Sequence, residues 1–553
     1  MADLKKLVLL CALTVLALTG ASFAQQSLGP VTTDNSIQND VSPAVSDLPT
    51  VAGAPTDVIG GEDGKEGPDN PYPLLADPNA PAGPGAPVQT ANLPLAQAVA
   101  GLNFAGMGAG AAGAGRFAPP DTNGAVGNGQ YVQAVNVAFA VYNKSTGALI
   151  SGPVAIKSLW SGFGGTCETR NDGDPIVQFD KIANRWIISQ FSVGGTPFLQ
   201  CIAVSTTPNA AGTYNRYAFS YGNNFIDYPK LGTWPDAYYA TYNAFNAAGT
   251  SFLGAKICAL NRSAMLVGAA ASQICFGNNG GSYSILPADF DGTVLPPAGS
   301  QEIMLEGDAT ANSSSVVHYF KIHVDFVTPA NTTGTVQNVA VPAYTQPCIG
   351  FSRGACVPQP PSTPAPGSSL LESLNFHMMH RLVWRMAGGR EELLATATVV
   401  AGARSGIRWY ESQNPHAASP TFFQAATYAP DAKWRWMPSI AMDKMGNIAV
   451  GYSVSDAVST YPSIAMSGRL RSELRNVLEP ETMLWNGTGA QTFFFRSTAP
   501  TTPVPLQRWG DYSEMTIDPA DDCTFYFTTE YIPSNGTFNW ETRIATFKFP
   551  NCN

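Results

Sequence analysis

The stretch Pro175-Ile-Val-Gln-Phe-Asp180 is followed, after a short turn, by the aromatic and β-branched run Arg185-Trp-Ile-Ile-Ser-Gln-Phe191. The same order recurs from Pro438-Ser-Ile-Ala-Met-Asp443 and from Ser513-Glu-Met-Thr-Ile-Asp518. Short runs rich in Val, Ile, Phe and Tyr on either side of a polar turn are typical of β-hairpins, and an aspartate at the turn accepts hydrogen bonds from backbone N–H groups. We therefore predict that each copy is a hairpin that turns at its aspartate.

These hairpins repeat along the chain. Pro120, Pro175 and Pro229 stand about 55 residues apart, a spacing that fits one four-stranded blade with long loops. The chain after residue 116 has room for about six to eight such units, and we favour seven blades with six as the alternative. The sequence therefore predicts an all-β, multi-bladed β-propeller, whose blades pack around one axis and leave only short strand edges.

The N-terminal part differs from the rest. Lysines, an apolar run from Leu7 to Leu18 and small residues up to Ala24 are typical of a secretory signal peptide. The next segment is rich in Pro, Gly and Ala without periodicity, so we predict a flexible leader, with a cleaved propeptide as the alternative. The chain is thus divided into a signal peptide (1–24), a leader (25–116) and a β-propeller (117–553). We expect a secreted, extracellular protein, with the periplasm or cell surface as alternatives.

Charge and composition narrow the partners. The chain has 40 acidic and 30 basic residues, and a net charge of −10. This balance repels nucleic acid and acidic membrane surfaces. No segment after the signal peptide has the length and hydrophobicity of a membrane span. We expect a monomer without a nucleic-acid partner, whose partner is an extracellular glycan or protein.

The cysteines predict disulfides. Eight remain after the signal peptide, an even number in an exported chain: Cys167, Cys201, Cys258, Cys275, Cys348, Cys356, Cys523 and Cys552. We predict that they pair in sequential order, because each adjacent pair falls within one strand-rich unit and short loops close most easily.

Several phrases resemble a known family: Pro119-Pro-Asp-Thr-Asn-Gly-Ala-Val-Gly127, Asn171-Asp-Gly-Asp-Pro-Ile-Val177, Tyr228-Pro-Lys-Leu-Gly-Thr-Trp-Pro-Asp-Ala-Tyr238, Gly406-Ile-Arg-Trp-Tyr-Glu411 and Arg508-Trp-Gly-Asp-Tyr-Ser513. They are similar to uncharacterised exported bacterial proteins described as sialidase-like, or BNR-type, β-propellers. The resemblance covers nearly everything after residue 117 and implies the fold. The Asp-box pattern Ser-x-Asp-x-Gly-x-Thr-Trp of true sialidases does not occur.

A sialidase-like site would need arginines to hold a carboxylate, together with acidic residues for acid–base chemistry. Residues of these types stand in several predicted blades: Arg408, Arg508, Asp511, Glu514 and Arg543. They would meet if they lie at the inner ends of their strands. The alternative is that Arg-Trp pairs such as Arg408-Trp409 and Arg508-Trp509 pack the blades, with arginine stems covering the rings.

Two further kinds of site are open. Asp172 and Asp174 stand in a short acidic turn of the type that holds calcium through oxygen ligands, and an Asx-turn that opens a strand is the alternative. Trp234, Tyr238 and Trp434 stand where aromatic rings at loop tips would bind a ligand, and packing between blades is the alternative.

Two functions follow from these residues. The first is a non-catalytic binding module that recognises a glycan or protein at one propeller face. The second is a sialidase-like glycoside hydrolase or lyase with its site at the mouth of the central channel.

Overall fold

The structure is a computed structural model. It describes residues 25–50, 59–61, 85–93, 97–111, 116–349, 354–361, 370–375, 377–492, 494–497, 503–506 and 508–553. The predicted signal peptide lies outside the described residues. The α-helices within these ranges are α1 (Gly165–Thr169) and α2 (Arg262–Leu266), and short 3₁₀ turns are η1 (Val45–Asp47), η3 (Ile156–Trp160) and η4 (Pro329–Asn331). Across the described ranges no helix combines the length and the hydrophobicity that crossing a membrane requires.

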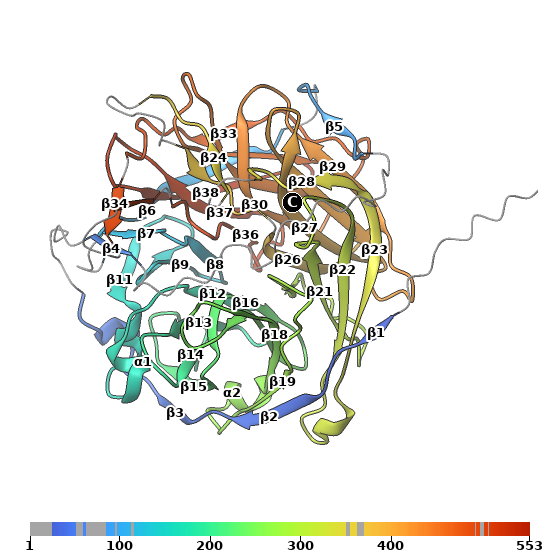
Figure 1. The fold of residues 1–553 in the computed structure, drawn as a ribbon. Helices are drawn as coiled ribbons and strands as arrows, with labels where there is room; N and C mark the ends of the chain where they lie inside the picture. Colours follow the sequence, from blue (N-terminus) through green and yellow to red (C-terminus); the bar gives the residue numbers. More distant parts are fainter. Residues whose placement is uncertain are drawn as a thin grey trace, which may run out of the picture.

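Most described strands form antiparallel groups of four, each running in chain order from its first strand to its last (Figure 1). The first three groups are β8 (Asn123–Val126), β9 (Gln130–Val135), β10 (Ala138–Asn143) and β11 (Leu149–Ala155); β12 (Ile176–Asp180), β13 (Arg185–Ser192), β14 (Phe198–Ser205) and β15 (Tyr214–Gly222); and β16 (Phe225–Thr233), β17 (Tyr238–Phe245), β18 (Phe252–Leu260) and β19 (Ser272–Phe276).

The next three groups repeat this arrangement. They are β20 (Leu286–Asp291), β21 (Glu302–Gly307), β22 (Ser313–His323) and β23 (Thr333–Thr345); β26 (Met378–Ala387), β27 (Arg390–Ala401), β28 (Arg404–Gln413) and β29 (Phe422–Tyr428); and β30 (Trp434–Met442), β31 (Ile448–Ser455), β32 (Ser463–Arg469) and β33 (Thr482–Trp485). A parallel pairing of β20 with β26 joins the fourth and fifth groups into one sheet.

The last group draws on both ends of the chain. Its strands are β36 (Glu514–Ile517), β37 (Phe525–Tyr531), β38 (Glu541–Lys548) and, paired with β38, the N-terminal β6 (Val99–Gly108). Counting each group of the described residues as one blade gives seven. Two short pairs lie outside the groups: β24 (Ala355–Val357) with β25 (Leu371–Glu372), and β34 (Phe494–Ser497) with β35 (Pro503–Leu506).

The first strands of the groups form a closed ring. β8 contacts β12, β12 contacts β16, β16 contacts β20, and β20 contacts β26. The series continues through β30 and β36, and β36 returns to β8. Sheets whose first strands meet around one axis in this way are the blades of a β-propeller. The predicted all-β propeller fold is therefore confirmed.

The repeated aspartates occupy equivalent places. Asp180, Asp443 and Asp518 each stand where the first strand of a group ends. The Oδ1 atom of each accepts hydrogen bonds from backbone N–H groups of the following turn. The pattern that opened the sequence analysis thus marks the innermost hairpin of a blade, and the Asx-turn is the reason why aspartate recurs there.

The described parts of residues 25–116 differ from the flexible leader that the sequence predicts. Strands β3 (Gln38–Val41), β2 (Val31–Asn35) and β1 (Gln26–Ser27) pair with β15, β19 and β23, and so add a fifth strand to three consecutive blades. Figure 1 shows them in blue along the outer rim. Further on, β5 (Val88–Gln89) pairs with β29, and β4 (Ile59–Gly61) pairs with β7 (Arg116–Ala118).

The physical reason is that strand addition uses backbone groups. An edge strand that pairs through N–H and C=O groups satisfies them without an alternating apolar face, so a segment without hydrophobic periodicity can be ordered by the sheet that it joins. We call β1, β2 and β3 the strap. The propeller therefore includes β6 and the strap, and does not begin at residue 117.

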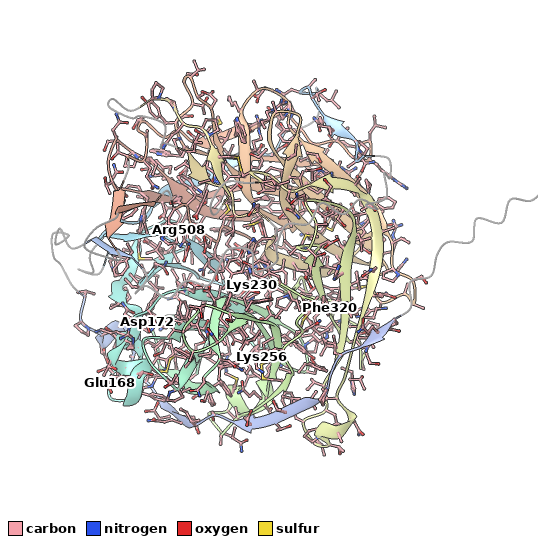
Figure 2. The ribbon with its side chains drawn as sticks, viewed as in Figure 1. Glu168, Asp172, Lys230, Lys256, Phe320 and Arg508 are labelled. Carbon is pink, nitrogen blue, oxygen red and sulfur yellow. A yellow bond between two sulfur atoms is a disulfide. The ribbon has the colours of Figure 1, made fainter. Side chains whose placement is uncertain are left out.

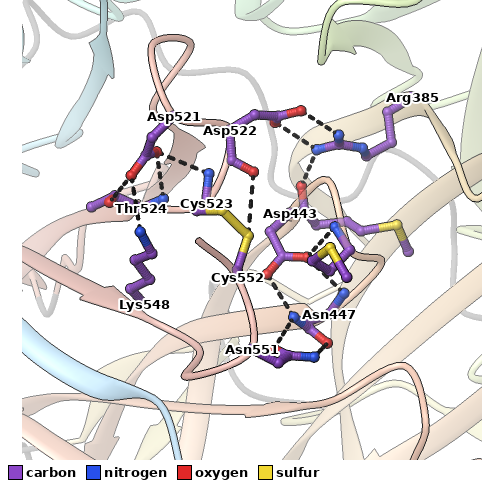
Figure 3. Close-up of a disulfide and its surroundings, with 12 residues drawn as sticks. Arg385, Asp443, Asn447, Asp521, Asp522, Cys523, Thr524, Lys548, Asn551 and Cys552 are labelled. Atoms are coloured by element: carbon purple, nitrogen blue, oxygen red, sulfur yellow. Dashed lines mark hydrogen bonds and ion pairs between the residues drawn. A yellow bond between two sulfur atoms is a disulfide. The ribbon is translucent and has the colours of Figure 1, made fainter.

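All eight cysteines pair in sequential order, as predicted. The bonds are Cys167–Cys201, Cys258–Cys275, Cys348–Cys356 and Cys523–Cys552. Figure 3 shows the last of them beside the turn of the neighbouring blade, where Asn551 bonds to Asn447 and Arg385 pairs with Asp522. The C-terminal blade is thereby tied to the two blades before it. Four disulfides fit an oxidising, extracellular compartment.

Candidate functional site

Unusual backbone turns stand just before or within the first strands of four blades. Asp121, Asp174, Tyr228 and Met437 have φ between 43° and 52°, in the left-handed region that residues other than glycine seldom adopt. Three of them, Asp174, Tyr228 and Met437, directly precede a proline. Because they occupy corresponding places in several blades, these turns bring residues far apart in the sequence to the propeller axis.

A polar cluster, which we call the axial cluster, forms where these turns meet. The Tyr512 hydroxyl donates to Asp174 Oδ2 at 3.1 Å and the Tyr228 hydroxyl donates to the Asp511 carbonyl at 3.3 Å. Asp121 accepts the Asp511 N–H at 2.7 Å. The Lys230 ammonium lies over both tyrosine rings, 2.9 Å from the Tyr228 centroid and 3.8 Å from the Tyr512 centroid.

The axial cluster is buried. Lys230 is 1% exposed, Asp121 0% and Asp174 2%. Burial lowers the pKa of Lys230 well below that of a free lysine, and Asp174, Asp511 and Asp121 offset this only in part. Burial, together with the neighbouring charges of Asp511 and Asp174, raises the pKa of Asp121. A lysine in this setting is held by rings and carboxylates rather than by water.

Residues from the connection between the fourth and fifth blades complete the cluster. Glu372 pairs with Arg508 at 2.8 Å, and Arg508 pairs with Asp511 at 2.9 Å. The His377 ring packs edge-on against Tyr228, with ring centroids 4.8 Å apart. The charges of the axial cluster therefore meet partners from the chain itself, which is the pattern of a structural network.

A second buried network lies around the axis on β20, β26 and β36. Arg381 forms ion pairs with Asp289 at 2.7 Å and Asp291 at 2.8 Å. Burial alone would raise the pKa of Asp291, but Arg381 and Lys181 lower it below the usual range. The candidate acid Glu514 accepts from His380 Nε2 at 3.1 Å. Glu514 is thus part of the ring that joins three blades.

The structure separates the predicted catalytic arginines. Arg408 donates to Thr427 and to backbone carbonyls, and Arg543 donates to Asn103 and lies over the Trp485 ring. Arg508 alone of the three reaches the axial cluster, where Asp511 also lies. The predicted residues that come together are therefore Arg508, Asp511 and Asp174, and no group of three arginines forms among the catalytic candidates.

The two aspartates of the acidic turn, Asp172 and Asp174, have different partners. Asp172 pairs with Arg170 at 2.8 Å and accepts the backbone N–H groups of Val193 and Gly194. Asp174 points to Tyr512 instead. Over the part of the chain that the structure describes, no three His, Cys, Asp or Glu residues gather in a metal-binding arrangement. Asp172 and Asp174 therefore face different partners within the chain.

The three aromatic candidates differ in their exposure. Trp234 and Tyr238 are each 1% exposed, where Trp234 packs against Trp384 and the Tyr238 hydroxyl donates to Asp180. These two rings pack blades together and present no surface to a ligand. Trp434 is half-buried and lines a cavity of about 410 Å³. The other lining residues are Pro347, Cys348, Ile349, Cys356, Val400, Gly402, Ala403 and Arg404.

Lys230 and Tyr512 were not singled out from the sequence. The local signal for Lys230 is the proline that follows the left-handed Tyr228, in Tyr228-Pro229-Lys230, whereas no proline stands near Tyr512. The cluster itself depends on turns from several blades, and no local pattern encodes that convergence.

The fold and these sites define the protein as a β-propeller with a closed, charged axis and an open cavity beside it. No protein family and no curated protein matches the chain. Among solved structures, an endo-arabinase from Bacteroides thetaiotaomicron VPI-5482 has 13% sequence identity and a TM-score of 0.24, over 53% of this chain and 92% of that one.

Two other solved structures are similar at the same low level. A Trypanosoma rangeli sialidase in complex with the inhibitor DANA has 8% identity and a TM-score of 0.32, over 67% of this chain and 54% of that one. Drosophila Semaphorin 1b, extracellular domains 1–2, has 7% identity and a TM-score of 0.30, over 83% and 89%. Similarity at this level says nothing about function, and the fold assignment rests on the ring of first strands.

Proposed function

We propose that this protein is a secreted, non-catalytic binding module that recognises an extracellular protein through the cavity around Trp434. The observation that carries the proposal is the contrast between that cavity and the propeller axis. The residues suited to catalysis are dispersed or neutralised by partners within the chain. The cavity around Trp434, in contrast, is open.

The lining of this cavity supports the choice of ligand. Its walls are mainly apolar, with the Trp434 ring and the Cys348–Cys356 disulfide among them, and Arg404 is the one charged side chain among the described residues that line it. The Nη2 atom of Arg404 already donates to the Ala429 carbonyl at 2.8 Å. A sugar needs several hydrogen-bonding partners, whereas an apolar side chain of a protein needs a pocket of this kind. Trp and Arg are also the residues that most often dominate protein interfaces.

A displayed-peptide selection tests the proposal. A random peptide library is selected on the immobilised full chain, and the selected peptides are measured against the Trp434→Ala variant by fluorescence anisotropy. We expect peptides that share an apolar residue, with binding about tenfold or more weaker to the variant. Selection of no peptide, or equal binding to both proteins, contradicts the proposal.

A parallel assay addresses the enzymatic alternative. The same full chain is incubated with a panel of fluorogenic glycosides, beside an Asp511→Asn variant. We expect no turnover by either protein. Turnover that the variant loses would replace the binding function with a hydrolase whose site is the axial cluster.

A further inference from the structure

A second cavity lies between the strap and the blades that it joins. It has a volume of about 410 Å³, and the strap supplies one wall of it, with Thr32, Asp34, Asn35 and Ile37. The edge of the second blade and the strands of the third supply the rest: Ser220, Tyr221, Gly222, Asn224, Lys256, Gln273 and Cys275. We call this cavity the strap cleft. It is far more polar than the cavity around Trp434, because most of its lining side chains carry an amide, hydroxyl, carboxylate or ammonium group.

Strand register places these polar groups on one face. Asp34 lies opposite Gln273 where β2 pairs with β19, and Lys256 lies opposite Tyr242 where β17 pairs with β18. Side chains two residues apart along a strand lie on the same face, so Lys256 and Cys258 lie on one face of β18. Cys258 stands opposite Cys275 of β19 and is bonded to it, so Cys275 lies on the same face of the sheet. The strap cleft is thus the face of the third blade that looks toward the edge of the second, closed on one side by the strap.

Part of the lining is fixed in place. The Tyr221 hydroxyl donates to the Tyr242 hydroxyl at 3.1 Å and to Gln273 Oε1 at 3.2 Å. The Asn224 N–H bonds to the Tyr221 carbonyl at 3.0 Å, which holds the turn at the mouth of the cleft. A site with its aromatic and amide groups already positioned loses little entropy when a ligand binds.

The charged groups of the cleft are left open. Within the described residues, no hydrogen bond or ion pair engages the side chain of Lys256 or of Asp34. Burial lowers the pKa of Lys256, and the charge of Asp34 partly offsets this effect, so the ammonium is partly withdrawn from water with Asp34 as a nearby opposite charge. Asp34 is exposed and Lys256 is half-buried, so water hydrates these groups in the free protein, and a polar ligand would replace that water.

We propose that the strap cleft binds a carbohydrate of one or two sugar rings. Its volume falls within the range of small-ligand sites, about 300–1,000 Å³. Ammonium, carboxylate and amide groups together offer both donors and acceptors, which suits hydroxyl groups that act as both. A phosphate is less well matched, because Asp34 and Lys256 line the same cavity and their opposite charges offset each other. An apolar ligand would leave these polar groups without partners.

This inference goes beyond the proposed function, because it assigns a second ligand class to a different place on the propeller. It also gives the strap a role. A strand that only covered a sheet edge would need no polar side chains facing the third blade, whereas Thr32 and Asp34 both line the cleft.

The test uses the full chain and an array of neutral and uronic-acid-containing oligosaccharides, followed by titration calorimetry on any glycan that binds. Lys256→Met retains the apolar stem and removes the ammonium, and Asp34→Ala removes the carboxylate. We expect each change to weaken binding by about tenfold, as for the loss of one or two hydrogen bonds. Trp434→Ala serves as the matched control and should leave glycan binding unchanged.

The outcomes separate the two sites. Binding that prefers uronic acids and is lost in Lys256→Met identifies Lys256 as a carboxylate partner, whereas equal binding of neutral sugars identifies it as a hydroxyl partner. Circular dichroism confirms that both variants are folded. The proposal is overturned if no oligosaccharide binds, or if Lys256→Met and Asp34→Ala both bind as the unchanged chain does.

Discussion

Two lysines of the same blade show how differently this propeller treats charge. Lys230, on the first strand β16, is enclosed by two tyrosine rings near three aspartates. Lys256, on the third strand β18, faces the strap cleft without a protein partner among the described residues. Figure 2 shows Lys230 near the middle of the ring and Lys256 closer to the strap.

The environments of Lys230 and Lys256 distinguish charged groups that stabilise the fold from charged groups that are accessible to a ligand. At the axis, strands from every blade converge and little water remains, so each ionised group needs a partner from the chain. At the rim the same blade is open to solvent on one side. We therefore assign ligand binding to the cavity around Trp434 and to the strap cleft, although the axis carries the larger number of reactive residue types.

The largest expected effect comes from Lys230→Met. The change removes the cation from a buried cluster and leaves Asp121, Asp174 and Asp511 facing one another. We expect the free energy of unfolding to fall by about 3–5 kcal/mol, as when one partner of a buried charge pair is removed. Urea denaturation followed by tryptophan fluorescence measures this change. A loss below about 1 kcal/mol would show that the axial cluster is open to water, and Lys230 would then not differ from Lys256 in its environment.

Glu479 is a buried carboxyl group that no cation contacts among the described residues. It is 0% exposed, and its oxygens accept the backbone N–H of Ala98 at 3.1 and 3.3 Å. Burial raises its pKa from 4.5 to about 8 in the folded chain. The folded state thus binds a proton that the unfolded state releases, so stability falls as the pH rises through this window.

Glu479→Gln should remove that pH dependence while it keeps an oxygen for Ala98. We expect both proteins to be equally stable near pH 4, and the variant to be more stable by up to about 5 kcal/mol near pH 9. Urea denaturation at both pH values measures the difference. A variant that is less stable than the unchanged chain at pH 9 would mean that the ionised carboxylate is stabilised by a partner after all.

A third change tests whether the N-terminal β6 is a true strand of the last blade. A Cβ atom at Gly106 would meet the side chains of Gln133 and Thr542, whereas one at Gly129 would meet open space. We expect Gly106→Ala to destabilise the chain by about 1–3 kcal/mol, as overpacking does. Gly129→Ala is the matched control and should change stability by less than about 0.5 kcal/mol. If both variants lose less than about 0.5 kcal/mol, β6 is not packed in the last blade and the prediction of a flexible leader stands for this segment.

The smallest effect is expected for Lys256→Met. Among the described residues the Lys256 side chain makes no hydrogen bond or ion pair, so the free energy of unfolding should change by less than about 0.5 kcal/mol. Thermal unfolding of Lys256→Met and Lys230→Met, measured in parallel, compares the two losses of stability. A large loss would indicate that Lys256 holds the strap in place instead of serving a ligand.

Much of the fold could be predicted from local sequence. The hairpin that turns at Asp180 recurs at Asp443 and Asp518 because each turn needs the same Asx hydrogen bonds, and the cysteines pair within their own strand-rich units. The strand pairing of the described residues between 25 and 116 could not be predicted. Strands β2, β3 and β6 are ordered by sheets that lie far away in sequence, and their own side chains show no strand-like alternation.

The candidate sites were only partly predictable for a similar reason. Arg508, Asp511, Asp174 and Trp434 were named by residue type, and the structure places the first three at the axis and the fourth at a cavity. No local sequence pattern distinguishes Lys230 from Lys256. What distinguishes them is which strand of the blade each occupies, and that is decided by how the whole ring closes.

Lysine labelling of the native protein tests the contrast most directly. The full chain is treated with formaldehyde and cyanoborohydride, and the methylated lysines are mapped by peptide mass spectrometry over time. We predict that Lys256 is modified in the folded protein, while Lys230 remains unmodified until the chain is unfolded in denaturant. Modification of Lys230 at a rate close to that of Lys256 would show that the axis is accessible, and would contradict the assignment of the axial cluster to structure and of ligand binding to the rim.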